Sequence, residues 1–262
     1  MSVSTGPLAG LRIGCVKYLN SRPLIHTCPE PIHLAHPSEL ARELHAGRLD
    51  AALVPVFEIL QHPHYALVDG VAISSDGPVY SVFLAHREPL VAIREVSLDP
   101  ASLTSANLIR VLLREFHGLS PEFVPEAPDS NARLLIGNQA IEFLLSSEGS
   151  AGWQILDLGA EWKRCTGLPF VYAAWALRPG LGNVAAVAEA FRALKAEGLE
   201  RIEEIVSAEQ IGTIELRRRY LTEHIRFDLG TREKAGLCEY RRLLRAQGRI
   251  SASSTSDELV FV

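Results

Sequence analysis

Small polar side chains follow the first apolar strand of the chain, where a ligand could be bound. Residues 13–16 form a short apolar run, Asn20 and Ser21 come next, and Pro23 follows them. The run is typical of a strand buried on both faces, and a polar pair before a proline is typical of a helix start. Ligands of open α/β sheets bind at the carboxyl ends of the strands. Asn20 and Ser21 are therefore candidate ligand-binding residues, and helix capping is the simpler alternative.

Two later helices also begin at small polar residues. Thr104 and Ser105 precede an expected helix at residues 108–116, and Asn138 follows an apolar strand that ends at Gly137. The backbone N–H groups of a helix N-terminus can bind a carboxylate or a phosphate, although most such ends bind only water. We expect Thr104 or Ser105 to cap the first of these helices.

One serine interrupts an apolar strand. Ser81 lies within the strand that we expect at residues 79–85. A serine in a strand is usually a core hydroxyl with a satisfied hydrogen bond, whereas at a cleft it would donate to a ligand. The residues alone leave both interpretations open.

The elements that position these residues alternate between strand and helix, which is typical of an α/β fold with a mainly parallel sheet. Apolar runs predict strands at residues 13–16, 32–35, 79–85, 134–137, 153–159 and 168–178. Helical spacing predicts helices at residues 37–45, 214–221 and 231–246, so the C-terminal part is helical. The strand at residues 168–178 is long enough to cross between two lobes.

Composition restricts the class of partner. The 262-residue chain is 47% hydrophobic and 22% charged, as is usual for folded globular proteins. Its formal net charge of −5 provides no basic field for nucleic acid or for an anionic membrane surface. The N-terminus lacks a basic and apolar leader, and no apolar run is long enough to span a bilayer. We therefore expect a cytoplasmic protein that binds neither nucleic acid nor membrane.

Neither the cysteines nor the histidines show the spacing of metal ligands. The four cysteines are scattered, at Cys15, Cys28, Cys165 and Cys238. His33 with His36, and His62 with His64, lie in proline-containing segments without a third ligand close by in the sequence. Loop histidines are the simpler interpretation, and a third ligand from a distant segment stays open. The sequence also lacks P-loop, dinucleotide-binding, zinc-protease and nucleophile-elbow motifs.

Several segments of the chain together form an ordered set that is known from one protein family. They are Tyr18-Leu19-Asn20-Ser21 with Pro23-Leu24, Val79-Tyr80-Ser81-Val82, Leu98-Asp99 with Thr104-Ser105, Asp157-Leu158-Gly159 with Glu161-Trp162-Lys163, and Thr166-Gly167-Leu168-Pro169-Phe170. This set resembles the chorismate dehydratases of menaquinone biosynthesis and extends over most of the chain. The sequence departs from the family pattern at Lys17, Leu103 and Asn138, where serine, arginine and aspartate are usual.

The resemblance implies a two-lobed fold like that of type II periplasmic binding proteins. Each lobe would hold a mainly parallel sheet flanked by helices, and the substrate cleft would lie between the lobes. We expect residues 1–87 and 175–262 to form the first lobe, and residues 88–174 to form the second. The strands at residues 79–85 and 171–177 would be the hinge crossings.

The resemblance also implies an activity. Members of the family eliminate water from chorismate to give 3-[(1-carboxyvinyl)oxy]benzoate, in the futalosine route to menaquinone. The chain would then be a carbon–oxygen lyase that acts on a small dianionic substrate and requires no cofactor and no metal. The nearest alternative is the 1,4-dihydroxy-6-naphthoate synthase of the same route, and the alternative from another class is a small-anion-binding protein without catalysis. The sequence gives no prediction of the oligomeric state.

Carried onto this sequence, the resemblance assigns catalytic roles to Asn20 and Ser81. The substrate-binding positions would be Ser21, Pro55, Thr104, Ser105, Asn107, Gly137 and Asn138. Because the substrate is a dianion and the chain is net acidic, recognition should rely on neutral donors and helix N-termini. The matched cleft segments offer no obvious side-chain base. We therefore expect Asn20 to orient the substrate, Ser81 to hold the leaving hydroxyl or a carboxylate, and the enolpyruvyl carboxylate of the substrate to act as the base.

Overall fold

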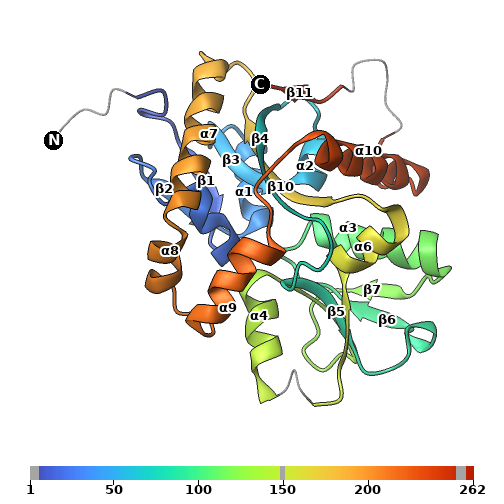
Figure 1. Ribbon diagram of the computed structural model, residues 1–262. Coiled ribbons are helices and arrows are strands. Elements are labelled where there is room, and N and C mark those ends of the chain that lie inside the picture. Colours follow the sequence, from blue (N-terminus) through green and yellow to red (C-terminus); the bar gives the residue numbers. More distant parts are fainter. Residues whose placement is uncertain (1–5, 148–150, 252–257) are drawn as a thin grey trace.

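Two β-sheets, each flanked by helices, form the frame of the molecule (Figure 1). The computed structural model describes residues 6–147, 151–251 and 258–262. The first sheet has the strand order β11-β4-β10-β3-β1-β2, and the second has the order β7-β6-β8-β5-β9. The strands of the first sheet are β1 (Ile13–Val16), β2 (Ile32–Ala35), β3 (Ala51–Pro55), β4 (Ala66–Ser75), β10 (Phe170–Leu177) and β11 (Val260–Phe261). Those of the second are β5 (Val82–His86), β6 (Glu95–Ser97), β7 (Glu122–Val124), β8 (Ala132–Ile136) and β9 (Gln154–Asp157).

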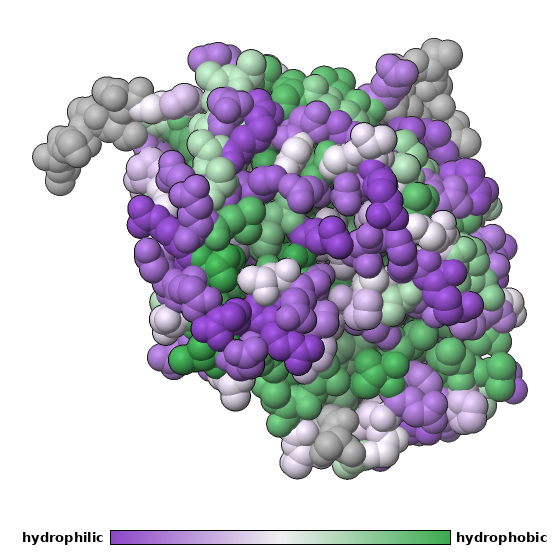
Figure 2. Space-filling model, in the orientation of Figure 1, coloured by the Kyte–Doolittle hydropathy of each residue, from purple (hydrophilic) through white to green (hydrophobic). Residues whose placement is uncertain are grey.

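Helices follow most strands and dominate the C-terminal part, as the sequence predicted. The α-helices are α1 (Pro37–His45), α2 (Val56–Gln61), α3 (Thr104–Val111), α4 (Gly137–Leu145), α6 (Leu158–Thr166), α7 (Val184–Glu200), α8 (Ile202–Ala208), α9 (Ile214–Arg219) and α10 (Thr231–Ala246). Short 3₁₀ helices form at η1 (Leu19–Leu24) and η2 (Leu90–Ala92), and π-helical turns form at η3 (Leu112–Phe116) and η4 (Tyr220–His224). Over the described part of the chain, no helix is both long and apolar enough to cross a membrane. Figure 2 shows polar residues over much of one face, with apolar residues gathered in its lower part.

Both sheets are mixed, because the chain reverses direction each time it passes between them. β1 runs parallel to β2 and β3, and β6 runs parallel to β7 and β8. The strand that follows each passage, β5 or β10, runs antiparallel to both of its neighbours. The α/β class is confirmed, but the expected mainly parallel pairing is corrected at these two strands. Alternation of strands and helices reveals βαβ units and does not reveal the direction of a strand that enters from another sheet.

Two segments connect the sheets. Residues 76–81 lead from β4 to β5, and residues 158–169, which include α6, lead from β9 to β10. The strands predicted as hinge crossings do not cross, because β5 lies wholly in the second sheet and β10 wholly in the first. The division into lobes at residues 87 and 175 stays a prediction. If each lobe is defined as one sheet with its helices, the lobe boundaries fall in the two connecting segments, at residues 76–81 and 158–169.

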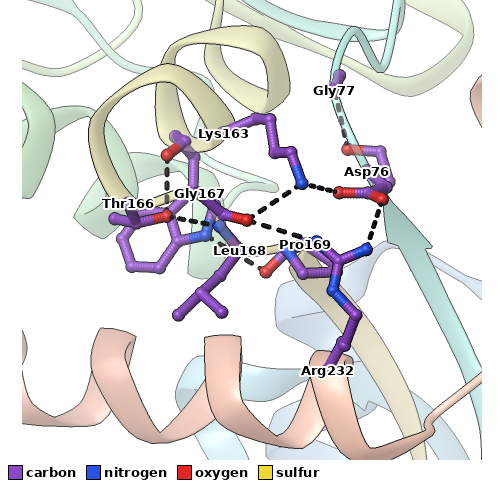
Figure 3. Close-up of polar contacts among 10 residues, drawn as sticks. Asp76, Gly77, Lys163, Thr166, Gly167, Leu168, Pro169 and Arg232 are labelled. Carbon is purple, nitrogen blue, oxygen red and sulfur yellow. Dashed lines mark hydrogen bonds and ion pairs between the residues drawn. The ribbon is translucent and has the colours of Figure 1, made fainter.

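A cluster of ion pairs joins the two connecting segments to α10 (Figure 3). The Asp76 carboxylate accepts hydrogen bonds from Lys163 Nζ at 2.5 Å and from Arg232 Nη1 at 3.0 Å. Both cations also donate to the carbonyl oxygen of Gly167, at 2.9 and 3.2 Å. Burial alone would raise the pKa of Asp76, but Lys163 and Arg232 outweigh burial and hold that pKa below its usual range. The charged form of Asp76 therefore stabilises this junction.

We expect Asp76→Asn to lower the free energy of unfolding at pH 7 by ~1–3 kcal/mol, because the charge-assisted hydrogen bonds are lost. A carboxylate whose pKa is lowered by folding stabilises the protein above its unfolded pKa and loses that effect as the pH falls through the folded pKa. The difference between wild type and Asp76→Asn should thus shrink below about pH 4. Urea unfolding between pH 7 and pH 3 measures it. Asp228→Asn, which removes a mostly exposed partner of Lys195, is the control and should change little. A difference that is independent of pH would contradict the prediction.

Two helices lie so close to neighbouring backbone that only glycine fits at the contact. A Cβ atom at Gly198 in α7 would lie 1.8 Å from the carbonyl oxygen of Pro23 in η1. A Cβ atom at Gly236 in α10 would lie 2.0 Å from the carbonyl oxygen of Pro169, just before β10. These contacts place α7 directly against η1 and α10 directly against the second connecting segment.

Gly198→Ala should therefore destabilise the protein by ~1–3 kcal/mol through overpacking. Glycine to alanine in a helix interior ordinarily stabilises by ~0.5–1 kcal/mol, so the expected sign is reversed here. Gly182→Ala is the matched control, because no atom lies within 4 Å of the Cβ position there. Urea denaturation of both variants checks the prediction, and a Gly198→Ala protein as stable as the wild type would refute the close contact.

Candidate active site

A pocket lies between the two sheets and encloses about 550 Å³ of empty space, which includes its opening to solvent. Its walls come from both sides of the molecule. The first sheet and its helices contribute Val16, Tyr18, Asn20, Pro37, Pro55, Ile73, Tyr172 and Ala173. The second sheet, its helices and the first connecting segment contribute Val79, Val82, Ser102, Leu103, Thr104, Ser105, Ile136 and Gly137. None of these residues is charged, so the polar groups of the wall are hydroxyls, an amide and backbone.

Asn20 lines this pocket, and its side-chain oxygen is unpaired. The side chain is buried, with 8% of its surface exposed, and Oδ1 has no hydrogen-bond partner among the described residues. The Asn20 side chain lies beside the Tyr220 hydroxyl, whose pKa it lowers. A buried amide oxygen without a partner is costly, and a bound ligand with a donor group would satisfy it.

Tyr220 joins Asn20 to Ser81. Its hydroxyl donates to Ser81 Oγ at 2.7 Å, and both side chains are buried. Burial raises the pKa of Tyr220, and the hydrogen bonds with Ser81 and Asn20 oppose that effect only in part, so the hydroxyl stays protonated. Tyr220 was not among the predicted site residues, because a tyrosine within an amphipathic helix is more often part of the core. Nothing in the local pattern of residues 214–221 distinguishes it.

Ser81 is positioned by the first connecting segment. Tyr80, next to it, has φ of 66°, a left-handed conformation that is uncommon outside glycine. The Asp157 carboxylate holds this turn by accepting the N–H groups of Val79 and Tyr80, at 3.0 and 2.7 Å. The Ser81 carbonyl in turn accepts the Gly137 N–H at 2.8 Å. Ser81 is fully buried and does not line the pocket. Its hydroxyl can influence the pocket only through Tyr220, which donates to it and lies beside Asn20.

The start of α4 packs against the turn that follows β1. Gly137 has φ of 61°, and a Cβ atom there would lie 2.8 Å from the Tyr18 ring. Asn138 Oδ1 accepts the backbone N–H of Leu19 at 3.0 Å. Asn138 thus joins the second sheet to η1 and does not line the pocket. Tyr18 does line it, with a buried hydroxyl that has no partner among the described residues.

Asn20 and Ser21 lie inside the 3₁₀ helix η1 and do not cap it. The helix begins after Tyr18, whose side chain makes no capping hydrogen bond. Ser21 Oγ donates to the carbonyl oxygens of Val16 at 2.6 Å and Tyr18 at 2.8 Å, and the residue has no exposed surface. Ser21 therefore shapes the turn that presents Asn20, and it does not line the pocket.

Thr104 and Ser105 line the pocket at the start of α3, but neither acts as the expected cap. Ser102 Oγ accepts the Ala106 N–H at 3.2 Å, and Thr104 Oγ1 accepts the N–H of Phe57 in α2 at 3.2 Å. The hydroxyl of Thr104 bonds to α2 instead of to its own helix because α2 and α3 pack together here. The sequence around residue 104 does not reveal that packing.

The remaining predicted binding positions separate into two groups. Pro55 precedes α2 and lines the pocket. Asn107 lies within α3, where its amide donates to the Leu103 carbonyl at 2.9 Å and its Oδ1 accepts from Arg249 Nε at 2.7 Å. Asn107 is thus occupied by these two contacts and is not part of the pocket wall.

Comparisons with known proteins identify the family and the fold. A family model described as menaquinone biosynthesis matches residues 11–246. The chain is 29% identical to the chorismate dehydratase of Thermus thermophilus over 88% of this chain and 94% of that protein. Among solved structures, protein AF1704 from Archaeoglobus fulgidus superposes with a TM-score of 0.72 at 15% identity and covers 92% of this chain and 98% of its own. The periplasmic aliphatic sulphonate binding protein SsuA from Escherichia coli has a TM-score of 0.62 at 16% identity, with 92% and 88% covered.

The expected periplasmic-binding-protein-like fold is therefore confirmed, and such a fold suits a small-molecule ligand. The family model spans nearly the whole described α/β frame, from just before β1 to the end of α10. This chain belongs to the menaquinone biosynthesis family.

Proposed function

We propose that the protein is a chorismate dehydratase, which eliminates water from chorismate to give 3-[(1-carboxyvinyl)oxy]benzoate. The observation that carries the proposal is Asn20, with its unpaired side-chain oxygen, in the wall of an uncharged pocket between the two sheets, beside Tyr220, which donates to Ser81. The Thermus thermophilus relative supports the same reaction class, a carbon–oxygen lyase.

The pocket wall suits a dianion that is recognised by neutral donors. Tyr18, Ser102 and Ser105, which carry hydroxyl groups, line the wall, and α3 begins there. The positive end of a helix dipole and fixed O–H donors favour a carboxylate without a formal positive charge. We propose that the two carboxylates of chorismate lie against these groups, and that the two sheets with their helices act as lobes that close on the substrate.

The proposed reaction is an elimination with carbanion character. The ring proton beside the enolpyruvyl ether is removed first, and the electron pair is delocalised through the ring alkene onto the ring carboxylate. Donors on that carboxylate stabilise the developing charge. The C–O bond to the neighbouring hydroxyl then breaks, and the ring becomes aromatic. The released hydroxide and the abstracted proton form water.

We propose that the enolpyruvyl carboxylate of the substrate takes the proton. The wall contains no Asp, Glu, His or Lys among the residues described, and the buried Tyr18 and Tyr172 have pKa values raised by burial. Asn20 would then orient the ring and the transferring proton, while Tyr220 and Ser81 keep the Asn20 amide in one rotamer. A carboxylate that loses its water in such a pocket becomes a stronger base.

We expect the purified chain to convert chorismate to a product lighter by one water with aromatic absorbance. Asn20→Ala should lower kcat by ~10²–10³, as the loss of one positioned polar group does in other enzymes, and should still bind the product. Ser81→Ala should lower kcat less, because Ser81 acts through Tyr220. Absorbance, mass spectrometry and product titration provide the measurements.

The outcomes separate the alternatives. Exposed Asn131→Ala is the control and should keep wild-type kcat. Chorismate that binds and is recovered unchanged would favour a binding protein without catalysis. Chorismate that neither binds nor reacts would favour the dihydroxynaphthoate synthase alternative. Normal turnover by Asn20→Ala would remove Asn20 from the mechanism.

Tyr220→Phe tests the positioning role. The substitution keeps the buried ring and removes the hydroxyl that contacts Asn20 and Ser81, so kcat should fall by ~10-fold or more with a smaller change in KM. Tyr65→Phe is the matched control: it removes another buried hydroxyl, which donates to Glu58 at 3.0 Å away from the pocket. Equal kcat in the two variants would show that Tyr220 is only a core residue.

A further inference from the structure

Three histidines and one glutamate converge on the side of the first sheet away from the pocket. His45 is the last residue of α1, Glu58 lies in α2, and His62 and His64 follow α2. His45 Nδ1 lies 3.8 Å from Glu58 Oε1, and His62 Nε2 lies 3.9 Å from the same oxygen. One ligand atom from each of these three residues lies within 4.8 Å of the others.

The neighbours of Glu58 are typical of a metal ligand and not of an ion-pair partner. Its side chain is 8% exposed, and the ion pairs formed among the described residues give it histidine partners and no lysine or arginine. The Tyr65 hydroxyl donates to Glu58 Oε1 at 3.0 Å and so fixes the orientation of the carboxylate. Hydrogen bonds to the ligating side chains are usual in metal sites. A buried carboxylate without a nearby cation is costly, and a bound metal ion would remove that cost.

The imidazole rings of this group are packed close together. The ring centres of His45 and His62 are 4.3 Å apart, and those of His62 and His64 are 5.8 Å apart. An imidazole nitrogen with a free lone pair is an atom that coordinates a cation, so close rings can present two such nitrogens to one ion.

We propose that His45, Glu58 and His62 bind one divalent cation of the zinc type. Two imidazole nitrogens and one carboxylate oxygen form a ligand set that Zn²⁺ accepts, with a fourth position open to water or to His64. Bonds of about 2.0–2.1 Å place tetrahedral ligand atoms roughly 3.4 Å apart, so the side chains must move closer together by up to about 1.5 Å. His45 and His62 are 53% and 33% exposed, so core packing does not enclose either ring.

The position of the cation implies a structural role. α1 begins at Pro37 and α2 follows Pro55, and both prolines line the pocket. The cation would join the opposite ends of the same two helices, at His45 and His62. It would stabilise the helices that support the pocket wall without touching the reacting atoms, so the proposed elimination does not pass through it.

A second group in the chain provides a matched control. His33, Glu39 and Glu43 also have ligand atoms within 4.8 Å of one another, and His33 is exposed. His33 Nε2 lies 3.1 Å from Glu43, so this group is an ordinary surface pair of histidine and carboxylate. Zinc bound non-specifically by exposed histidines would depend on His33 as much as on His45.

The test is calorimetric titration of the chelator-treated full chain with zinc chloride, with Co²⁺ as a spectroscopic substitute. We expect one Zn²⁺ per chain, visible absorption of tetrahedral Co²⁺, and a Tm that rises with Zn²⁺ concentration. His45→Gln and His62→Gln should each weaken Zn²⁺ binding by ~10–100-fold, whereas His33→Gln should leave it unchanged. The metal-free variants should melt within a few degrees of the metal-free wild type, which shows that they fold.

Three results would overturn the proposal. The wild type could fail to bind Zn²⁺ stoichiometrically. Alternatively, His45→Gln and His62→Gln could each bind Zn²⁺ as tightly as the wild type, or His33→Gln could lose the binding. The readouts are binding and spectra, so they stand apart from chorismate turnover, and a failure here leaves the proposed dehydratase activity unaffected.

Discussion

The Asp157 carboxylate fixes the two connecting segments to each other, and the site depends on that contact. It accepts the N–H groups of Val79 and Tyr80 in the first segment and of Ala160 at the start of α6 in the second. Burial raises the pKa of Asp157, and the N–H groups of Ala160, Tyr80 and Val79 offset part of that effect. The turn that Asp157 holds delivers Ser81 to Tyr220, and Tyr220 in turn orients Asn20. A carboxylate that takes no part in the proposed chemistry thus sets its geometry.

A site made of neutral groups functions only if those groups are held still. In water, the O–H and N–H dipoles around an anion reorient freely, whereas in a protein they stabilise charge because they are already oriented. Here Asn20 is held by Tyr220, η1 is held by Asn138 and by Gly198 of α7, and Thr104 is held by Phe57. These hydrogen bonds fix the groups around the pocket. Among the described residues, Asn20 Oδ1 and Tyr18 Oη are buried without a partner.

The sequence revealed what depends on neighbours in the chain and missed what depends on distant partners. Asn20 was found because a buried strand, a turn and a proline follow one another within a dozen residues. Tyr220 was missed because its partner Ser81 is 139 positions away. Ser21 and Thr104 have the composition of helix caps, but their hydroxyls bond to Val16 and Phe57, so a correct local preference predicted the wrong role. The direction of β5 and β10 was missed for the same reason, since each strand pairs with strands from other parts of the chain.

The distribution of charge over the first sheet bears on the identity of the base. At the amino ends of β1 and β3, Asp50 accepts from Arg12 at 2.9 Å and from Arg178 at 2.6 Å, and the Arg12 hydrogen bonds hold the pKa of Asp50 well below its usual range. At the carboxyl ends of the same strands, the described pocket wall has no charged side chain. A substrate carboxylate bound there meets neither a competing base nor a guanidinium that would lower its pKa. In the proposed reaction, the same absence of charged side chains that leaves the described wall without a base would strengthen the carboxylate of the substrate as a base.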